Sequence, residues 1–428
     1  MNRPLPEDFI LLARTAMGDD RFARFMAALD EEPPVSIRLN PLKAKGMLAK
    51  GGVRVAWCDE GYYLPARPNF TFDPLLHAGC YYVQEAASMF ISHVVRQLIT
   101  EPVAMLDLCA APGGKSTALL AALPEGSRLV SNEPVRQRFQ VLSENLAKWG
   151  YPNHTATNRY PRDFRRDGHS YDAILCDVPC SGEGMFRKDP QAVSEWSLQN
   201  VERCWRLQRE IVSDAWACLK PGGLLIYSTC TFNTLENEQN VRWMQQELGA
   251  EPQTVDIQAD WGITGSLLEG FDAPVYRFIP GLTRSEGLFM CVLRKPGDAT
   301  KDRCVHDTTP LCRQHNAPST TSKGHFKTIK AEAPLPQEAL LASGPNGDVA
   351  IVDVDYPTAI AFLRREAITL PPDAPRGYVA VSFRGHALGF AKNIGQRANN
   401  LYPREWAIRS TYVPDAYSPV MLTVDKEF

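Results

Sequence analysis

Two cysteines stand in polar turns that each follow an apolar run. Cys180 lies in "DVPCSGEG" after the run "YDAILC", and Cys230 lies in "YSTCTFN" after the run "GLLI". If both runs are strands of an open parallel sheet, the two turns lie at the sheet edge where ligands bind. The polar neighbours of these two cysteines favour a chemical role. For four other cysteines we keep the ordinary interpretation of a cytosolic cysteine as a small buried hydrophobe: Cys176, Cys204, Cys218 and Cys291.

A pair of thiols suits a methyl acceptor that needs covalent activation. Carbon 5 of a pyrimidine is a poor nucleophile, but a thiolate that adds to carbon 6 activates it, provided that an acid supports charge at ring nitrogen 3. Asp177 is placed for that role. The proton on carbon 5 must then leave, helped by a second thiol or a water, so the residues alone do not order the two cysteines. Lys188 in "FRKDP" is one candidate for lowering the thiol pKa, and a solvated surface lysine is the alternative.

The stretch "DLCAAPGGKSTALL", residues 107–120, ends like a phosphate-binding loop. Such a loop has a first glycine where this chain has Cys109, and a dinucleotide Gly-x-Gly-x-x-Gly motif is also missing. A turn with Gly113 and Gly114 remains, before a helix whose amino end would attract a small carboxylate. The next apolar run ends in "SNE", where Glu133 can accept hydrogen bonds from two ribose hydroxyls. Together these features indicate a site for S-adenosylmethionine. A turn that only packs a helix on a sheet is the alternative.

The elements around these motifs predict an α/β fold with a doubly wound, Rossmann-like parallel sheet. Between residues 105 and 294, short apolar runs alternate with amphipathic stretches. We expect helices at 116–122, 136–149, 200–219 and 236–247. Residues 7–29 predict a helical N-terminus. Near the C-terminus, "DVAIVDVD", "GYVAVSFRG" and "HALGFAKN" alternate like strands around the helix-like "TAIAFLRRE", which favours a small α+β or barrel domain.

Length and composition limit the class of protein. A chain of 428 residues suits two or three domains. It has no apolar run of about 18 residues, and Glu7 and Asp8 stand where a signal peptide would be apolar, so we expect a soluble, cytoplasmic protein without membrane contact. Residues 296–335 lack apolar periodicity and read as a linker. Within them, the spacing of Cys304, His306, Cys312 and His315 fits no standard zinc site, and we expect no metal.

Contacts with nucleic acid would have to use local patches, because 46 basic residues face 49 acidic ones. Residues 375–410 contain one acid and six basic residues near Tyr402 and Trp406, a pattern that suits looped RNA. A solvated strand face with core aromatics is the alternative. Basic stretches at 38–54 and 159–166 flank the predicted cleft. The six basic residues are Arg376, Arg384, Lys392, Arg397, Arg404 and Arg409.

Three motifs, in this order and spacing, resemble the signature of the Nol/Nop/Sun family of RNA cytosine-5 methyltransferases: "DLCAAPGGKST", "DVPCSGEGMFRKDP" and "YSTCTFNTLENE". The upstream "SIRLNPLK" and "YYVQEAASM" share the resemblance, and "GFAKNIGQRANNLYPREW" is similar to the PUA-like end of the bacterial RsmF branch. The resemblance implies an N-terminal α+β RNA-binding region at 1–90, a methyltransferase core at 91–295, a linker at 296–335 and a PUA-like RNA-binding domain at 336–428.

The resemblance also implies roles for single residues. In that family the cysteine of the Ser-Thr-Cys turn is the nucleophile, which corresponds to Cys230. The cysteine of the Pro-Cys turn assists release of the product, which corresponds to Cys180. Asp177 would lie between the cofactor and the cytosine, and Glu133 would hold the ribose. The remainder of the cofactor would contact Cys109, Ala110, Ala111, Pro112, Gly113, Gly114, Lys115 and Asp177.

Two departures from the family pattern leave roles open. Many members have an aspartate near the adenine where this chain has Asn158, and Asp163 is the other candidate. The stretch "QEAASM" replaces the more usual Gln-Asp-x-Ser-Ser, which leaves the role of Glu85 undefined.

The function that the resemblance implies is S-adenosylmethionine-dependent methylation of carbon 5 of cytosine in structured RNA. The RNA would be small-subunit ribosomal RNA, free or within a particle, and the enzyme a monomer. One alternative is a transfer RNA cytosine-5 methyltransferase. Two others are an ATP-dependent RNA remodelling protein, suggested by Gly-Lys-Ser-Thr, and a non-catalytic RNA-binding assembly factor.

Overall fold

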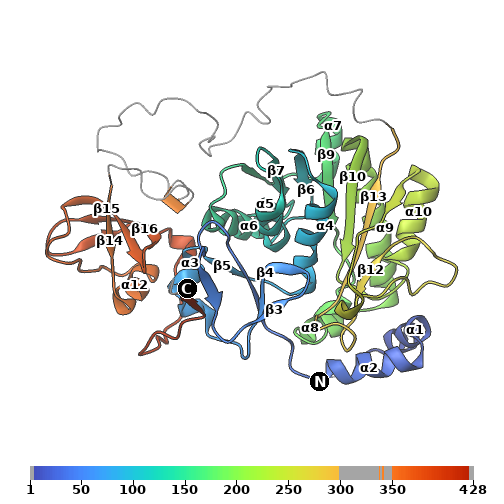
Figure 1. Ribbon diagram of the computed structural model, residues 1–428, viewed down its shortest axis with the longest axis horizontal. Coiled ribbons are helices and arrows are strands. Elements are labelled where there is room, and N and C mark those ends of the chain that lie inside the picture. The colour runs from blue at the N-terminus through green and yellow to red at the C-terminus, as the bar shows by residue number, and fades with distance from the viewer. Residues whose placement is uncertain (1–3, 298–336, 338–339, 342–348, 424–428) are drawn as a thin grey trace.

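The computed structural model describes residues 4–297, 337, 340–341 and 349–423. Its centre is a doubly wound sheet with the strand order β11-β13-β10-β9-β6-β7-β8 (Figure 1). Five strands are parallel, and β13 runs antiparallel to β10. The predicted fold class is therefore confirmed. The strands are β6 (Ala104–Asp107), β7 (Arg128–Asn132), β8 (His154–Thr157), β9 (Tyr171–Asp177), β10 (Leu219–Thr229), β11 (Glu251–Gln253), β12 (Tyr276–Phe278), which pairs with β13, and β13 (Leu288–Arg294).

Helices cover both faces of this sheet, which lies between them in Figure 1. Along β6, Met105 packs against one set of helices and Leu106 against the other, because successive strand residues point to opposite faces. The first face is covered by α4 (Phe90–Leu98), α5 (Gly114–Ala122) and α6 (Arg136–Trp149). The second face is covered by α7 (Pro161–Arg166), α9 (Leu198–Cys218) and α10 (Glu238–Leu248). The strand order reverses between β6 and β9, and that switch point is where an open α/β sheet binds its ligands.

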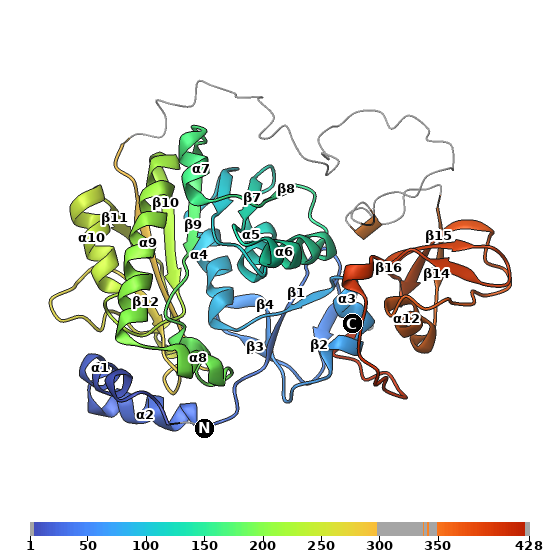
Figure 2. The same cartoon turned by 180° about the vertical axis from the view of Figure 1, so that it is seen from behind.

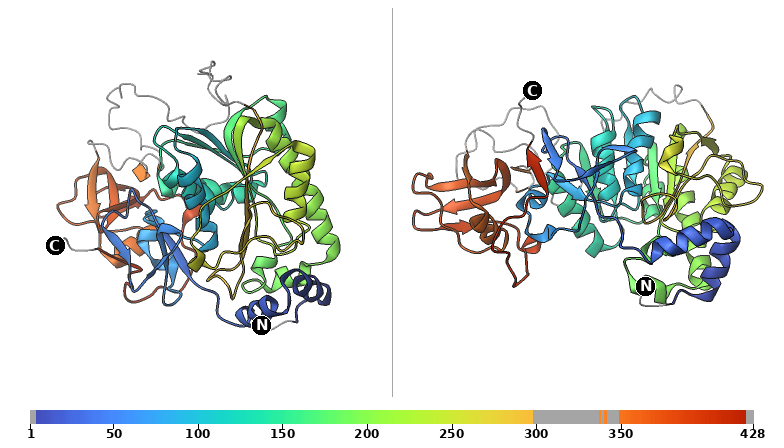
Figure 3. Two further views of the ribbon diagram at one scale, coloured as in Figure 1. Left: turned by 45° about the vertical axis from the view of Figure 1, so that its right-hand side comes forward. Right: turned by 60° about the horizontal axis from the view of Figure 1, so that its bottom comes forward.

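The predicted N-terminal helix is in fact a pair of helices, α1 (Glu7–Met17) and α2 (Asp19–Leu29). Gly18 separates them with a φ of 73°, a left-handed backbone that favours glycine. Both helices pack on the unit that contains the central sheet, beside α8 (Pro190–Glu195), as Figure 3 shows. Their apolar faces share one cluster with Phe186, Trp196 and Phe232.

The remainder of the N-terminal region forms an antiparallel sheet, which shares a hydrophobic core with the C-terminal domain. Ile37 and Tyr81 of the N-terminal sheet belong to the same cluster as Phe362 and Leu388. A short ladder between β2 and β18 adds backbone hydrogen bonds across this junction (Figure 2). The N-terminal elements are β1 (Ser36–Leu39), β2 (Met47–Ala49), β3 (Val53–Val55), β4 (Cys58–Tyr63), α3 (Pro74–His77) and β5 (Tyr81–Val83). The C-terminal elements are β14 (Ala350–Asp353), α12 (Tyr356–Leu363), β15 (Gly377–Phe383), β16 (His386–Asn393), β17 (Ala398–Asn400) and β18 (Met421–Thr423).

Short 3-10 helices complete the structure at Phe70–Phe72, Ala87–Met89, Glu183–Met185, Ala259–Trp261 and Arg404–Trp406. Most of the predicted linker, together with Cys304, His306, Cys312 and His315, lies outside the described residues. Within the described ranges, no group of three or more His, Cys, Asp or Glu side chains is arranged to hold a metal ion. No helix in the same ranges is long and apolar enough to cross a membrane.

Candidate active site

The two cysteine turns meet at the carboxyl ends of neighbouring parallel strands. β9 leads to Cys180 and β10 leads to Cys230, and Asp177 and Ser228 are register partners on these strands. The Cys180 and Cys230 sulfur atoms lie 3.3 Å apart, and both side chains are half-buried. The structure therefore brings together the two thiols that the sequence singled out.

The two thiols have different surroundings. A hydrogen bond with Cys230, followed by burial, raises the pKa of Cys180 well above its ordinary value. A thiol that keeps its proton can donate its S–H to the neighbouring sulfur. Either sulfur can be the donor in this contact, and a protonated Cys180 is able to donate to Cys230.

Asp177 has a partner on each carboxylate oxygen. Lys115 Nζ donates to Oδ2 at 2.9 Å, and Ser228 Oγ donates to Oδ1 at 2.7 Å. Burial alone would lower the pKa of Lys115, but the charge and hydrogen bond of Asp177, together with the nearby Cys230, raise it. The positive charge near the thiols is thus Lys115, at the start of α5. Lys188, which the sequence suggested for this role, lies 3.9 Å from Glu286 Oε1.

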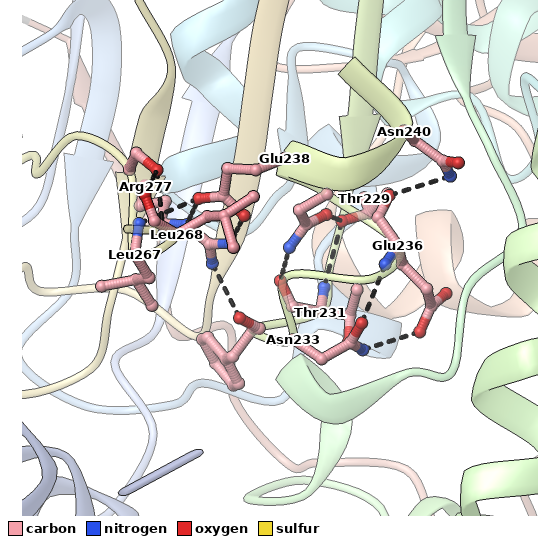
Figure 4. Close-up of polar contacts among 12 residues, drawn as sticks. Thr229, Thr231, Asn233, Glu236, Glu238, Asn240, Leu267, Leu268 and Arg277 are labelled. Carbon is pink, nitrogen blue, oxygen red and sulfur yellow. Dashed lines mark hydrogen bonds and ion pairs between the residues drawn. The ribbon is translucent and has the colours of Figure 1, made fainter. Parts of the chain in front are cut away.

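Polar residues that follow Cys230 fix the turn that carries it. Thr229 Oγ1 donates to Asn237 Oδ1 at 2.6 Å, and Asn237 Nδ2 donates to the carbonyl of Thr231 at 2.8 Å. Glu238 forms a buried ion pair with Arg277, whose Nε donates to Oε1 at 2.7 Å (Figure 4). The sequence predicted no role for these residues. The available signal was a cluster of polar residues at the start of a helix, of which Glu236, Asn237 and Glu238 are fully buried.

The turn between β6 and α5 is held from three sides. The N–H of Ala110 donates to the carbonyl of Asn132 at 2.8 Å. Arg138 Nη2 donates to the carbonyl of Ala111, and Asn145 Nδ2 donates to that of Pro112, both at 2.8 Å. Gly113 begins the helix with a left-handed φ of 111°, and a Cβ there would lie 3.2 Å from Leu142 Cδ1. A glycine is therefore required for this turn to lie against α6.

Two buried carboxyl oxygens beside this turn have no hydrogen-bond partner in the described part of the chain. Glu133 Oε1 accepts from the N–H of Val135, but Oε2 has no such donor, although Arg138 Nη1 lies 3.2 Å away. Asp107 Oδ2 accepts from Ser116 Oγ at 2.6 Å, whereas Oδ1 is unpartnered. Burial raises the pKa of Asp107 to about 7. Both oxygens can therefore accept hydrogen bonds from a ligand that brings donors, as the ribose hydroxyls and ammonium group of S-adenosylmethionine would.

The two candidates for an adenine contact differ in position. Asn158 Nδ2 donates to the carbonyls of Glu133 and Pro134, so its side chain lies directly beside the predicted ribose site. Asp163 Oδ2 instead accepts from the N–H of Tyr160 and caps α7. Which of them contacts adenine stays a prediction, and the geometry favours Asn158.

Glu85, whose role the sequence left open, joins the N-terminal region to the core. Its Oε2 accepts from the N–H of Ser88 at 2.9 Å, and its Oε1 accepts from the N–H of Glu286 at 3.1 Å. Arg187 binds the Glu286 carboxylate through two nitrogens and also donates to the carbonyl of Ala28. Glu85 therefore belongs to the network that anchors the segment before β13.

Several residues assigned to RNA contact prove to be buried, and that interpretation is wrong for them. Tyr402 is 1% exposed and packs its ring on Phe362. Arg38 is also 1% exposed, and its Nε donates to Gln84 Oε1 at 2.7 Å. Lys43 is half-buried, and its Nζ donates to two backbone carbonyls at helix ends, those of Ala78 and Lys148. Counting basic and aromatic residues does not distinguish these structural roles from a surface.

Other basic groups do lie on the surface. Arg165 and Arg166 are exposed but have acidic neighbours, Asp214 at 2.9 Å and Asp163 at 3.5 Å respectively. Arg159 is paired with Asp167. In the C-terminal domain, all six basic residues of the predicted patch are exposed: Arg376, Arg384, Lys392, Arg397, Arg404 and Arg409.

Models of three protein domains match the chain. The model for 16S rRNA methyltransferase RsmB/F matches residues 99–294. The model for the N-terminal domain of 16S rRNA methyltransferase RsmF matches residues 5–86, and the model for the methyltransferase RsmF PUA domain matches residues 349–408. The predicted combination of a methyltransferase core with an N-terminal and a PUA domain is thus confirmed.

Curated relatives align along most of the chain. Ribosomal RNA small subunit methyltransferase F of Cronobacter sakazakii is 35% identical over 94% of this chain and 96% of the relative. The protein of the same name from Klebsiella pneumoniae is 34% identical with the same coverage. The one from Pectobacterium atrosepticum is 36% identical, but that alignment spans 68% of this chain and 63% of the relative.

Solved structures share the fold. NSun6 from Pyrococcus horikoshii with SFG has a TM-score of 0.57 at 21% identity, covering 68% of this chain and 99% of the other. A methyltransferase homolog protein from the same organism has a TM-score of 0.55 at 24% identity, covering 68% of this chain and 100% of the other.

Proposed function

The chain belongs to the ribosomal RNA small subunit methyltransferase F family, whose cofactor is S-adenosylmethionine, and we propose that it methylates carbon 5 of cytosine in small-subunit ribosomal RNA through a covalent bond to Cys230. One observation supports this proposal above the others. Two thiols lie 3.3 Å apart beside Asp177, at the sheet edge that also carries the turn before α5. A single thiol would suffice for packing, whereas a covalent route uses a nucleophile and a group that assists its release.

The first proposed step is addition of the Cys230 sulfur to carbon 6 of the cytosine. A thiolate is the attacking form of a cysteine, and Lys115, whose pKa is raised by Asp177 and by the nearby Cys230, places a positive charge close to this sulfur. The Asp177 carboxylate lies at the same sheet edge and can stabilise a proton at ring nitrogen 3 while electron density moves to carbon 5. S-adenosylmethionine, when bound, supplies the methyl group that carbon 5 receives.

The last proposed step releases the product. Loss of the carbon 5 proton to water restores the ring double bond and breaks the bond between carbon 6 and Cys230. Cys180 keeps its proton and lies next to that sulfur, so it can donate a hydrogen bond to the departing thiolate. Cys180 is therefore proposed as the residue that assists release.

The cofactor would be held by the turn at residues 109–115, with Glu133 at the ribose and Asn158 near the adenine. A nucleoside triphosphate fits this site less well. Asp107, Glu133 and Asp177 present carboxylates that would repel phosphates, and Cys109 replaces the glycine of a triphosphate loop. An ATP-driven function is thus disfavoured by the charges of the site.

The substrate is proposed from the RNA-binding elements. The PUA domain exposes six basic residues, and the N-terminal sheet shares its core with that domain, so both would contact the RNA together. Action by a monomer, in the cytoplasm and on free RNA or a small-subunit particle, stays a prediction.

The test supplies wild-type protein and S-adenosylmethionine with small-subunit ribosomal RNA, with small-subunit particles and with transfer RNA. Nucleoside mass spectrometry should find 5-methylcytosine in one of the ribosomal substrates. Modification of transfer RNA alone would favour the alternative enzyme, and RNA binding without methyl transfer would favour an assembly factor. Calorimetric titration should show binding of S-adenosylmethionine and none of ATP.

A further inference from the structure

The two loops that carry the cysteines each contain a buried glutamate, and each glutamate accepts hydrogen bonds from the other loop. Glu183, three residues after Cys180, is 1% exposed, and its Oε2 accepts from the N–H groups of Phe232 at 2.6 Å and Asn233 at 3.0 Å. Glu236, on the Cys230 loop, is fully buried, and its Oε2 accepts from the N–H of Ser181 at 3.0 Å. The two contacts are reciprocal, so neither loop can shift without breaking a hydrogen bond to a buried carboxylate.

The side chain of Asn233 joins the two carboxylates. Its Nδ2 donates to Glu183 Oε1 at 2.9 Å and to Glu236 Oε1 at 2.8 Å, and Figure 4 shows Asn233 directed at Glu236. Trp196 Nε1 donates to Glu183 Oε1 at 3.0 Å, and Gln208 Nε2 donates to Glu236 Oε2 at 2.6 Å. All of these partners are hydrogen-bond donors. A carboxylate accepts at both oxygens and so can bind all of them, whereas an amide has one accepting oxygen and a nitrogen that only donates.

Backbone contact transmits this arrangement to the sulfur atoms. The N–H of Gly184 donates to the carbonyl of Cys230 at 2.7 Å, and a Cβ at Gly184 would lie 2.6 Å from that oxygen. Ser181, which binds Glu236, directly follows Cys180 in the chain. The separation of the two sulfur atoms is therefore determined by how closely the loops approach each other.

We propose that Glu183 and Glu236 are positioning residues. They hold the two cysteines close enough for the Cys180 S–H to donate to the Cys230 sulfur when the bond between that sulfur and the cytosine breaks. The role rests on the covalent reaction proposed above. Neither glutamate needs to contact the cofactor or the cytosine, because both act through the backbone of the opposite loop.

The first test measures the distance between the thiols without any methyl transfer. Diamide oxidises two adjacent thiols to a disulfide and takes up both hydrogens at its nitrogen–nitrogen double bond. In wild-type protein the Cys180–Cys230 disulfide should form rapidly, as peptide mass spectrometry can follow. Glu183→Gln and Glu236→Gln should each form it at least about 10-fold more slowly, because a small misplacement strongly reduces the rate of a proximity-dependent reaction.

Asp73→Asn is the matched control. Asp73 is a buried carboxylate like Glu236, but it accepts from Tyr81 Oη at 2.9 Å and from the N–H of Leu75 at 3.0 Å, in the N-terminal region and not in either cysteine loop. Its variant should lose thermal stability and still form the disulfide within about 2-fold of the wild-type rate. If a glutamate variant does not fold, Asn233→Ala removes the bridging amide from a half-buried position and should slow the oxidation by about 3-fold or more.

The second test measures turnover on RNA. Both glutamate variants should lower kcat by about 10- to 100-fold with little change in KM for RNA, because the reacting groups are misplaced but the binding surfaces are intact. Oxidation rates equal to wild type in both variants would overturn the positioning role alone. A wild-type protein that forms the disulfide but transfers no methyl group to RNA would instead overturn the proposed function.

Discussion

At the scale of single residues, the site depends on a mostly buried ion pair between Lys115 and Asp177. The Lys115 side chain is 13% exposed and that of Asp177 is 31% exposed, so water screens their attraction only partly. The pair fixes the Asp177 carboxylate and keeps a positive charge near Cys230. A lysine in this sequence position looks like the phosphate-binding lysine of a triphosphate loop, but here its partner is a carboxylate of the same chain.

This pairing predicts strong coupling between the two residues. Lys115→Met and Asp177→Asn should each lower the single-turnover rate by about 100-fold, because each leaves a partly buried group without its partner. The double variant should be little worse than either single one, with a coupling free energy of about 1 to 3 kcal/mol. Single-turnover methylation at saturating S-adenosylmethionine provides the measurement. Effects that simply add would show that the two residues act independently.

Sequence reasoning identified the reacting residues better than their surroundings. Cys180, Cys230, Asp177 and Glu133 follow strands, and strand order alone brings such residues to one edge of the sheet. The sequence suggested Lys188 as the neighbouring cation and did not indicate the proximity of Lys115 to Cys230, because that depends on how far a side chain reaches across the sheet edge. Burial of a charge cannot be read from a count of basic residues either, as Arg38 demonstrates.

At the scale of elements, the α1–α2 hairpin supports both cysteine loops. Phe9 packs edge-on against Phe186 on the Cys180 side, with ring centroids 4.9 Å apart. Phe25 packs edge-on against Phe232 on the Cys230 side, also at 4.9 Å. Because the N–H of Phe232 is the donor to Glu183, the hairpin fixes the same loops that the buried glutamates connect.

The hairpin therefore contributes to turnover as well as to stability. Phe25→Ala should destabilise the protein by about 3 to 5 kcal/mol, the range for removing a buried aromatic ring. It should also speed hydrogen exchange at residues 231–233 and lower kcat. Leu11→Ala is the control, since Leu11 is 65% exposed on α1 and should change neither quantity. Unchanged exchange at residues 231–233 in Phe25→Ala would contradict a supporting role for the hairpin.

Elements with strong periodicity were predicted closely. The helix predicted at 136–149 has those bounds in α6, and the predicted strand "HALGFAKN" is β16. The helix predicted over 7–29 missed the break at Gly18, because one glycine inside an amphipathic pattern does not reveal its φ angle. The packing of that hairpin on the core depends on contacts distant in sequence, which a local pattern cannot predict.

At the scale of the whole molecule, the N-terminal sheet and the C-terminal domain unite around one core that contains a buried histidine. His77 Nε2 lies 2.8 Å from the carbonyl of Thr71, and Nδ1 has no hydrogen-bond partner among the described residues. Burial, followed by the charge of Lys148, lowers the pKa of His77 from 6.5 to about 3. Between these two pKa values, His77 is therefore neutral in the folded protein and protonated in the unfolded chain.

The sign of the pH effect follows from this lowered pKa. Above pH 6.5, His77 is neutral in both states and stability is fully present. As the pH falls from 6.5 toward 3, the unfolded state gains a proton first, and stability is lost by up to about 1.4 kcal/mol per pH unit. His77→Gln should therefore lose less thermal stability between pH 7 and pH 4.5 than wild type does. Parallel loss in both proteins, measured by calorimetry, would show that His77 does not carry the effect.

The domain boundaries proposed from the sequence, at residues 90, 295 and 335, stay predictions. The N-terminal region packs in two places. Helices α1 and α2 pack on the methyltransferase core, whereas the N-terminal strands pack on the C-terminal domain. Sequence patterns show which segments fold locally. They do not show which segments share a core.

The most direct measurement of the central claim is the mass of the protein after incubation with substrate RNA and S-adenosylmethionine, followed by denaturation and nuclease digestion. Cys180→Ala should accumulate protein carrying a covalently attached nucleotide, because Cys230 still bonds to the base but its release is slowed. Cys230→Ala should carry none and should have no turnover. An adduct found only in Cys230→Ala would contradict the account and reverse the roles of the two thiols.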